Sequence, residues 1–210
     1  MREPLAVLLL ALLLGGGPAR AADDTPGRFD YWLLALSWSP QYCQERPGEE
    51  QCQRVYGFVV HGLWPQHERG YPEFCGRSTP VEARWIDRLL PLMPSEKLIA
   101  HQWRKHGSCS GLSQDDYFQA IERVRRRTAI PPRFQSPREL LRLPQQALEA
   151  DFVAANPGFS ADGIAVQCSG RFLREVRLCY SRDFEPRRCG IDVRDRCGES
   201  VTLRPSRSAY

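Results

Sequence analysis

The number and spread of the cysteines constrain the fold of this chain more than any other feature of its sequence. The eight are Cys43, Cys52, Cys75, Cys109, Cys168, Cys179, Cys189 and Cys197. No CxxC pair is present, which disfavours a zinc site. An even number of cysteines indicates disulfides if the chain is exported, which its first residues, described next, predict. Eight cysteines allow about 105 pairings, so their spacing alone leaves the connectivity open.

The first residues have the composition of a secretory signal peptide. A basic residue precedes an apolar run over residues 5–14, and the segment that ends at Ala21 fits a small-x-small cleavage site. The apolar run is too short to span a bilayer. We therefore expect a signal peptide at 1–21, one folded domain at 22–210, and a periplasmic or secreted protein with no membrane association after cleavage.

All histidines and both lysines lie in one part of the chain, residues 61–106. The formal net charge is +4, and loss of the signal peptide lowers it to about +3, which permits a polyanionic partner without requiring one. The four histidines are His61, His67, His101 and His106. Nearly all of the basic residues are arginines. Lys105, one of two lysines, directly precedes His106. A lysine supplies a compact point charge where arginine supplies a planar fork.

The hydrophobic pattern favours an α+β fold. Strands are predicted at 29–38, 56–64, 163–168 and 171–181, and helices at 81–93, 95–107, 115–127 and 144–156. Ser95 and Ser113 are expected helix caps, and Ser136-Pro137 resembles the start of a further helix. The tail after Cys197 is polar and is expected to lack regular structure. Strands at both ends with helices between them disfavour a regular βαβ alternation.

Two short segments carry most of the chemistry. HGLWPQ, residues 61–66, places a histidine and a tryptophan at the end of a predicted strand, and AHQWRKHGSC, residues 100–109, lies on a predicted helix. Because helix positions three and four apart share a face, Gln102, Lys105 and His106 are predicted neighbours. His101 lies one turn before Lys105, whereas Trp103 faces the core.

The spacing of these residues favours acid–base chemistry on RNA. His101 and His106 are five residues apart, which separates them by about 140° on a helix and does not suit a zinc pair. The sequence contains no GxSxG motif, the usual setting of a serine nucleophile. RNA carries its own nucleophile, the 2′-hydroxyl. Two histidines in opposite protonation states, with a lysine for the phosphorane charge, suit its cleavage without a metal or cofactor.

These segments resemble a known family. FVVHGLWP together with HQWRKHGSC resembles the paired catalytic segments of the ribonuclease T2 family, whose second segment usually reads HEWxKHGTC. FDYWLLALSWSPQYC and CSGRFLREVRLCYS are further matches, and the resemblance covers roughly residues 28–197. It implies an α+β fold with a central antiparallel sheet and packed helices.

The resemblance also implies a reaction and roles for individual residues. The family cleaves RNA endonucleolytically to a 2′,3′-cyclic phosphate, which is then hydrolysed to a 3′-phosphate. By motif position, His106 is the expected general base and His61 the general acid of the first step. Lys105 is expected to stabilise the transition state, His101 to hold the phosphate, and Trp64 to stack on the base upstream of the cleaved bond.

The resemblance further implies partners and cysteine pairs. The implied pairs are Cys43–Cys52 and Cys75–Cys109, with Cys168–Cys197 and Cys179–Cys189 among the last four. RNA is the expected substrate, DNA is excluded because it lacks the 2′-hydroxyl, and the protein is expected to be a monomer.

The chain departs from the family pattern at several positions. Gln102 stands where the catalytic helix usually has a glutamate, and an amide keeps hydrogen-bonding capacity but loses the charge. We expect His106 to be less basic as a result and turnover to be lower by about ten- to a hundredfold. The alternative is that the amide donates a hydrogen bond to the phosphate and little activity is lost. Ser37 and Gln66 replace residues used for base choice, which predicts broad base specificity, and Tyr71 is expected to flank the base pocket.

Two other functions fit the same sequence. Gln102 could mark an exported RNA-binding protein of this fold that has lost catalysis. Alternatively, the fold could serve a partner protein with an inactive site. The presence of His61, Lys105 and His106 favours the enzyme over both.

Overall fold

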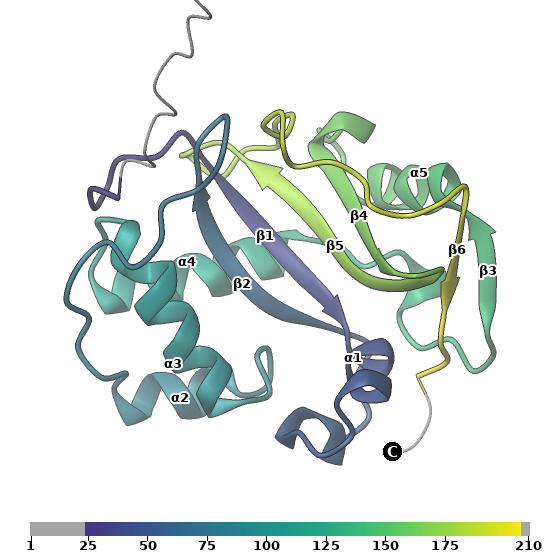
Figure 1. Cartoon of the computed structure of the whole chain (residues 1–210), viewed down its shortest axis with the longest axis horizontal. Coiled ribbons are helices and arrows are strands. Elements are labelled where there is room, and N and C mark those ends of the chain that lie inside the picture. The colour runs from purple at the N-terminus through teal and green to yellow at the C-terminus, as the bar shows by residue number, and fades with distance from the viewer. Residues whose placement is uncertain (1–23, 207–210) are drawn as a thin grey trace, which may run out of the picture.

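The computed structural model describes residues 24–206, and the predicted signal peptide at 1–21 lies outside that range. Within it, six strands form one sheet with five α-helices around it (Figure 1). The strands are β1 Tyr31–Trp38, β2 Phe58–Gln66, β3 Leu141–Pro144, β4 Ile164–Ser169, β5 Phe172–Tyr180 and β6 Ser200–Leu203. The helices are α1 Ser39–Glu45, α2 Ala83–Leu89, α3 Glu96–Lys105, α4 Gln114–Arg127 and α5 Gln145–Ala155.

The sheet confirms the predicted α+β class. Its strand order is β2-β1-β5-β6-β3, and β4 pairs with Phe172–Leu178 of β5 outside this path. Four of the pairings are antiparallel, as expected, whereas β5 and β6 meet in parallel at Phe172 and Thr202, so the sheet is mixed. The long strands β2, β1 and β5 lie side by side and form the platform of the site (Figure 1).

Alternate residues of β1 face two different environments. Leu34, Leu36 and Trp38 belong to the main core, which the helices cover. Leu33 and Ala35 face the opposite side, where Cys179 and Trp64 pack against them. Such alternation follows from the period of two in a strand. Figure 1 shows α2, α3 and α4 gathered near β2, and α5 near β3 and β6 at the other end of the sheet.

The predicted helix caps are confirmed. The Ser95 hydroxyl accepts a hydrogen bond from the backbone N–H of Leu98 at the start of α3. The Ser113 hydroxyl accepts the N–H of Asp116 at 3.1 Å and donates to its carboxylate at 2.7 Å. These bonds satisfy backbone donors that have no partner within a helix, and they fix where α3 and α4 begin.

Two expectations about the C-terminal half are wrong. The segment from Ser136 does not begin a helix, since its hydroxyl donates to the Gln135 carbonyl and the chain enters β3 instead. The tail after Cys197 is not irregular, because it contains β6, whose Val201 and Leu203 are fully buried. Pairing of β6 with β3 gives this short segment its backbone partners.

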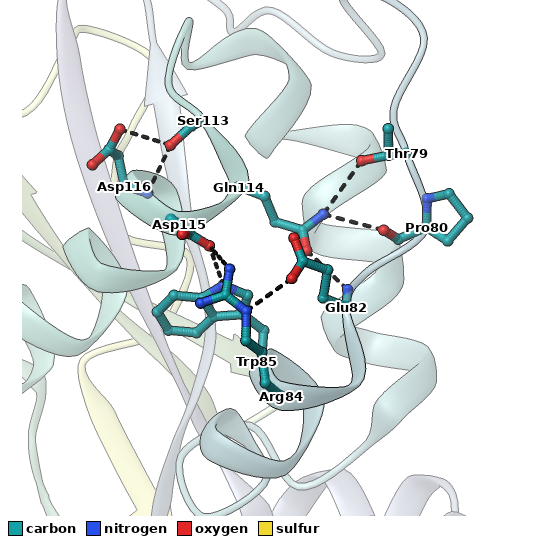
Figure 2. Close-up of polar contacts among 9 residues, drawn as sticks. All are labelled: Thr79, Pro80, Glu82, Arg84, Trp85, Ser113, Gln114, Asp115 and Asp116. Atoms are coloured by element: carbon teal, nitrogen blue, oxygen red, sulfur yellow. Dashed lines mark hydrogen bonds and ion pairs between the residues drawn. The ribbon is translucent and has the colours of Figure 1, made fainter.

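The long connection from β2 to α2 is fastened to α4. Gln114 accepts the backbone N–H of Glu82 and donates to the carbonyl of Pro80, while Asp115 accepts from Arg84 and the Trp85 indole at 2.6 Å each (Figure 2). These contacts fix the far end of the connection, and its near end carries aromatic and acidic side chains of the site described below.

The structure contains four disulfides, in the pairs that the family resemblance implies. They are Cys43–Cys52, Cys75–Cys109, Cys168–Cys197 and Cys179–Cys189. No cysteine among the described residues is free. The pair Cys75–Cys109 closes a stretch of 34 residues that includes α2 and α3, so it links the β2–α2 connection to the turn that follows α3.

Candidate active site

A bulge in β2 directs the first histidine of the site. Gly62 pairs with Ala35 of β1 and Val60 pairs with Leu36, so His61 stands opposite no residue of its neighbour. A bulge of this kind bends the strand and re-aims a side chain. The His61 side chain is 36 % exposed. It thus lies where a substrate could reach it.

A buried carboxylate on β5, across β1 from β2, supports His61. His61 Nδ1 lies 2.6 Å from Glu175 Oε2 on β5, and the other oxygen of Glu175 accepts the Arg177 Nε–H at 2.7 Å. The Arg177 guanidinium lies 5.5 Å from the centroid of the Trp64 ring, and this ring lies 5.1 Å from His61, nearly perpendicular to it. Strands β2 and β5 together hold the histidine, carboxylate, guanidinium and indole in one cluster.

Helix α3 brings its predicted residues to the other side of the same cluster. Gln102 is 1 % exposed, and its amide oxygen accepts the Trp64 indole N–H at 2.6 Å. His106 caps the helix, with its backbone N–H donating to the Gln102 carbonyl. Trp103 is buried in the main core, as its place on the helix predicts. The spacing of the helix therefore puts its polar face on the site and its indole in the core.

Glycine at position 62 permits this close approach of α3 to β2. A Cβ there would lie 2.2 Å from both the Gln102 amide oxygen and the Trp64 indole nitrogen. Only a residue without a side chain fits between the helix and the strand. Close packing of α3 against β2 thus explains the glycine of the HGLW segment.

The second histidine, His106, is held neutral by its surroundings. Its side chain is buried, and burial together with the charges of Lys105, His61 and His101 lowers the pKa of His106 to about 2. Its ring stacks on Trp64 with 5.1 Å between centroids, and its Nδ1 has no hydrogen-bond partner among the described residues. A neutral imidazole can accept a proton, so this group suits a general base.

The lysine of the helix meets side chains from the β2–α2 connection. Lys105 Nζ lies 2.9 Å from Glu73 Oε2, and 5.6 and 5.8 Å from the ring centroids of Tyr71 and Phe74. The Lys105 carbonyl accepts the Phe74 N–H, which fastens the connection to the helix beside the disulfide. Tyr71 is exposed and lies 6.0 Å from His106, so it offers the more accessible aromatic surface, whereas Trp64 is partly covered by His106.

A pocket of about 280 Å³ opens beside His61. Ser37, His101, Lys97 and Glu175 are among the residues that line it. Burial, and then the charges of Arg104, Lys105 and His61, lower the pKa of His101. The pocket lies between the strands that carry His61 and the helix that carries His101, since residues of β1, β2, β5 and α3 line it.

The structure thus brings together all seven residues predicted for the site, and it adds three that sequence reasoning missed. The seven are His61, Trp64, Tyr71, His101, Gln102, Lys105 and His106, and their roles stay predictions. Glu73, Glu175 and Arg177 are the additional ones. Glu175 carried a weak signal, because it is an acidic residue inside a strand whose other residues are largely buried.

Residues 24–206 show neither a metal-ligand cluster nor a membrane-spanning helix. No group of three or more His, Cys, Asp or Glu side chains is placed to hold a metal ion. No helix in this range is long and apolar enough to cross a membrane.

Solved structures resemble this fold. An RNase-related protein from Calystegia sepium superposes with a TM-score of 0.70 at 20 % identity, covering 86 % of this chain and 99 % of its own. RNase NT in complex with 5′-AMP superposes with a TM-score of 0.63 at 22 % identity, covering 85 % and 99 % of the two chains. At these identities the likeness concerns the fold alone.

Sequence comparison identifies the family. A ribonuclease of Aeromonas hydrophila is 39 % identical over 84 % of this chain and 84 % of its own length. A probable ribonuclease of Haemophilus influenzae is 31 % identical over 76 % of this chain and 61 % of its own. The sequence profile of the Ribonuclease T2 family matches residues 29–189, which include both histidine segments and the β5 strand behind them. The chain therefore belongs to the ribonuclease T2 family.

Proposed function

We propose that this protein is an exported, metal-independent endoribonuclease that cleaves RNA by transphosphorylation. Membership of the family supports endonucleolytic action on RNA. One observation carries the proposed mechanism: the two histidines lie in opposite electrostatic surroundings. His106 is buried beside Lys105, which keeps it neutral, whereas Glu175 gives a protonated His61 an ion-pair partner. A neutral base and a charged acid are what the reaction needs at one pH.

The proposed first step forms a cyclic phosphate. His106 removes the proton of the 2′-hydroxyl, and the resulting oxygen attacks the adjacent phosphorus. Lys105, His101 and the Gln102 amide stabilise the negative charge that gathers on the phosphorane oxygens. His61 then protonates the departing 5′-oxygen. In the second step the two histidines exchange roles and water opens the 2′,3′-cyclic phosphate to a 3′-phosphate.

The surfaces around the histidines support an RNA substrate. Tyr71 and Trp64 lie on the His106 side and offer aromatic rings to the base upstream of the cleaved bond. The pocket beside His61 is placed for the nucleoside that leaves with the 5′-oxygen. We expect broad base specificity, since the serine at position 37 is a small side chain on the wall of that pocket.

Digestion of ribosomal RNA in excess EDTA near neutral pH tests the proposal. We expect fragments with 2′,3′-cyclic phosphate ends, and we expect H106A to form none. His67→Ala is a matched control, because His67 pairs with Asp30 outside the site, and it should cleave like the unmodified protein. Cleavage that stops on metal removal, or equal digestion of a deoxyribonucleotide polymer, would contradict the mechanism.

Gln102 favours one second candidate, an RNA-binding protein without catalysis. The neutral amide is already engaged by the Trp64 indole and brings no charge to the phosphate. RNA that binds the protein in the same assay but remains intact would support this function over the enzyme.

The four disulfides support an oxidising location outside the cytoplasm. Export to the periplasm or medium, directed by residues 1–21, and a monomeric state complete the proposal. Fractionation of the expressing cells and the N-terminal sequence of the exported protein test the location and the cleavage after Ala21.

A further inference from the structure

Glu175 is a buried carboxylate in the middle of the sheet, and its burial calls for an explanation. The residue is 5 % exposed and lies on β5, paired in register with Ser37 of β1. A carboxylate in such a place is costly unless each oxygen has a partner. Both do: one contacts His61 Nδ1 at 2.6 Å, and the other accepts from Arg177 Nε at 2.7 Å.

The partners keep Glu175 ionised. Burial alone would raise the pKa of Glu175, but the hydrogen bond and charge of His61 and the charge of Arg177 outweigh it and lower the pKa to about 2. An ionised carboxylate can only accept hydrogen bonds. The proton of the 2.6 Å contact therefore belongs to His61, on Nδ1, and this leaves Nε2 as the ring atom available to a substrate.

We propose that Glu175 is the positioning residue for the proton donor, holding the His61 ring by Nδ1–H so that Nε2 delivers the proton to the departing 5′-oxygen. This inference rests on the proposed function. In this step the P–O5′ bond breaks with its electron pair on O5′, the Nε2 proton moves to O5′, and His61 is left neutral with its proton on Nδ1.

Arg177 connects Glu175 to the Trp64 indole. Its guanidinium binds Glu175 through Nε and lies 5.5 Å from the Trp64 ring centroid. Strand β5 therefore fixes the ring of His61 and approaches the indole beside it. A position on a central strand gives less freedom than a loop would, which suits a group that must hold a proton donor in one orientation.

A leaving-group comparison tests the role of Glu175. A dinucleoside phosphate expels an alkoxide and needs a proton donor, whereas a nucleoside 3′-(4-nitrophenyl phosphate) expels a phenolate that leaves without one. For E175Q, which keeps the shape and removes the charge, we expect kcat/KM on the dinucleoside phosphate to fall by about 10- to 100-fold. On the aryl ester it should change by less than about threefold. H61A should show the same pattern with a larger loss.

The matched control is E122Q. Glu122 is also buried, and both of its oxygens accept from the Arg88 guanidinium at 2.6 Å, but it lies on α4 outside the site. We expect E122Q to leave the ratio of the two substrates unchanged. An equal loss on both substrates in E175Q would mean a merely structural role and would overturn the inference, as would full activity on both.

Nitrogen-15 NMR of the His61 ring provides a readout that does not depend on activity. Near neutral pH we expect Nδ1 to be protonated in the unmodified protein and E175A to lose this preference. A His61 that carries its only proton on Nε2 would overturn the inference whether or not RNA is cleaved. If the unmodified protein cleaves neither substrate, the proposed function fails and the inferred role falls with it; activity without an effect of E175Q refutes the inference alone.

Discussion

Replacing Gln102 by glutamate tests how the catalytic helix controls the basicity of His106. Gln102 is almost fully buried, and the hydrogen bond that its amide oxygen accepts from the Trp64 indole is one that a carboxylate oxygen would keep. The substitution therefore adds a negative charge beside Lys105 and His106 with little change of shape. We expect Q102E to cleave RNA faster than the unmodified protein.

The size of the gain follows from the helix geometry. Positions 102 and 106 are four residues apart, so their Cβ atoms lie about 5–6 Å from each other. An opposite charge at about 4–6 Å shifts a pKa by about 1–3 units. The pKa of His106 is lowered to about 2 by burial and by its cationic neighbours, and the new carboxylate would raise it. If about half of a two-unit gain in basicity appears in the rate of proton transfer, cleavage accelerates about tenfold.

Initial rates on a dinucleoside phosphate across the acid and neutral range measure the effect. We expect a higher kcat/KM for Q102E, with the acid limb of the pH profile moved to higher pH because the base has become easier to protonate. Gln41→Glu is the control, since Gln41 is also buried and its amide oxygen accepts from Arg204 Nε, outside the cluster of site residues, and it should not accelerate cleavage. A slower Q102E would refute the idea that the amide is a handicap.

Three further predictions concern stability and substrate binding. His106 and Glu175 both have a lowered pKa in the folded protein. The unfolded chain therefore binds more protons in acid, and stability should fall as the pH drops below about 6.5 for the histidine and from about 4.5 towards 2 for the glutamate. Urea unfolding at a series of pH values measures this, and H106A should reduce the fall between about 6.5 and 4.5 to the part that the lowered pKa of His101 contributes. Replacing Cys75 and Cys109 together by alanine should cost about 4 kcal/mol, from the loop-closure entropy of 34 residues, and an unchanged unfolding midpoint would contradict that figure. E73Q removes a partly exposed carboxylate that pairs with the active-site lysine, so KM for RNA should fall by about two- to fivefold at low salt, and a rise in KM would show that the pair instead orients the lysine.

The parts of the fold that sequence predicts are those specified by local periodicity. The helices at 95–107 and 115–127 have clear caps and apolar stripes, and both are present as α3 and α4 with the expected serine caps. The β6 strand was missed because four residues carry too little pattern by themselves. Its stability comes from pairing with β3, more than fifty residues earlier in the chain, and such pairing depends on tertiary structure.

The same distinction separates the two halves of the site. On α3, the helical pitch alone places Gln102 and His106 on one face, so their proximity could be predicted without knowledge of the fold. The contact between His61 and Glu175 spans 114 residues and depends on the register of two strand pairs and on the bulge in β2. A shift of one residue between β5 and β1 would turn Glu175 to the other face of the sheet, and the same shift between β2 and β1 would turn His61 away. No local pattern fixes either register.

The distribution of carboxylates also bears on how a member of this family could work with Gln102. The charge missing from the helix leaves His106 beside Lys105 without an anionic neighbour on α3, which favours its neutral form. Glu175 lies instead on the side of His61, where a carboxylate stabilises the charged form of an imidazole. The negative charge of the site thus lies beside the proposed proton donor, and the lowered pKa of His106 makes it a weak base. If both effects operate, Q102E and E175Q should act in opposite directions on cleavage of the dinucleoside phosphate, and the double variant should show which of the two histidines limits the rate.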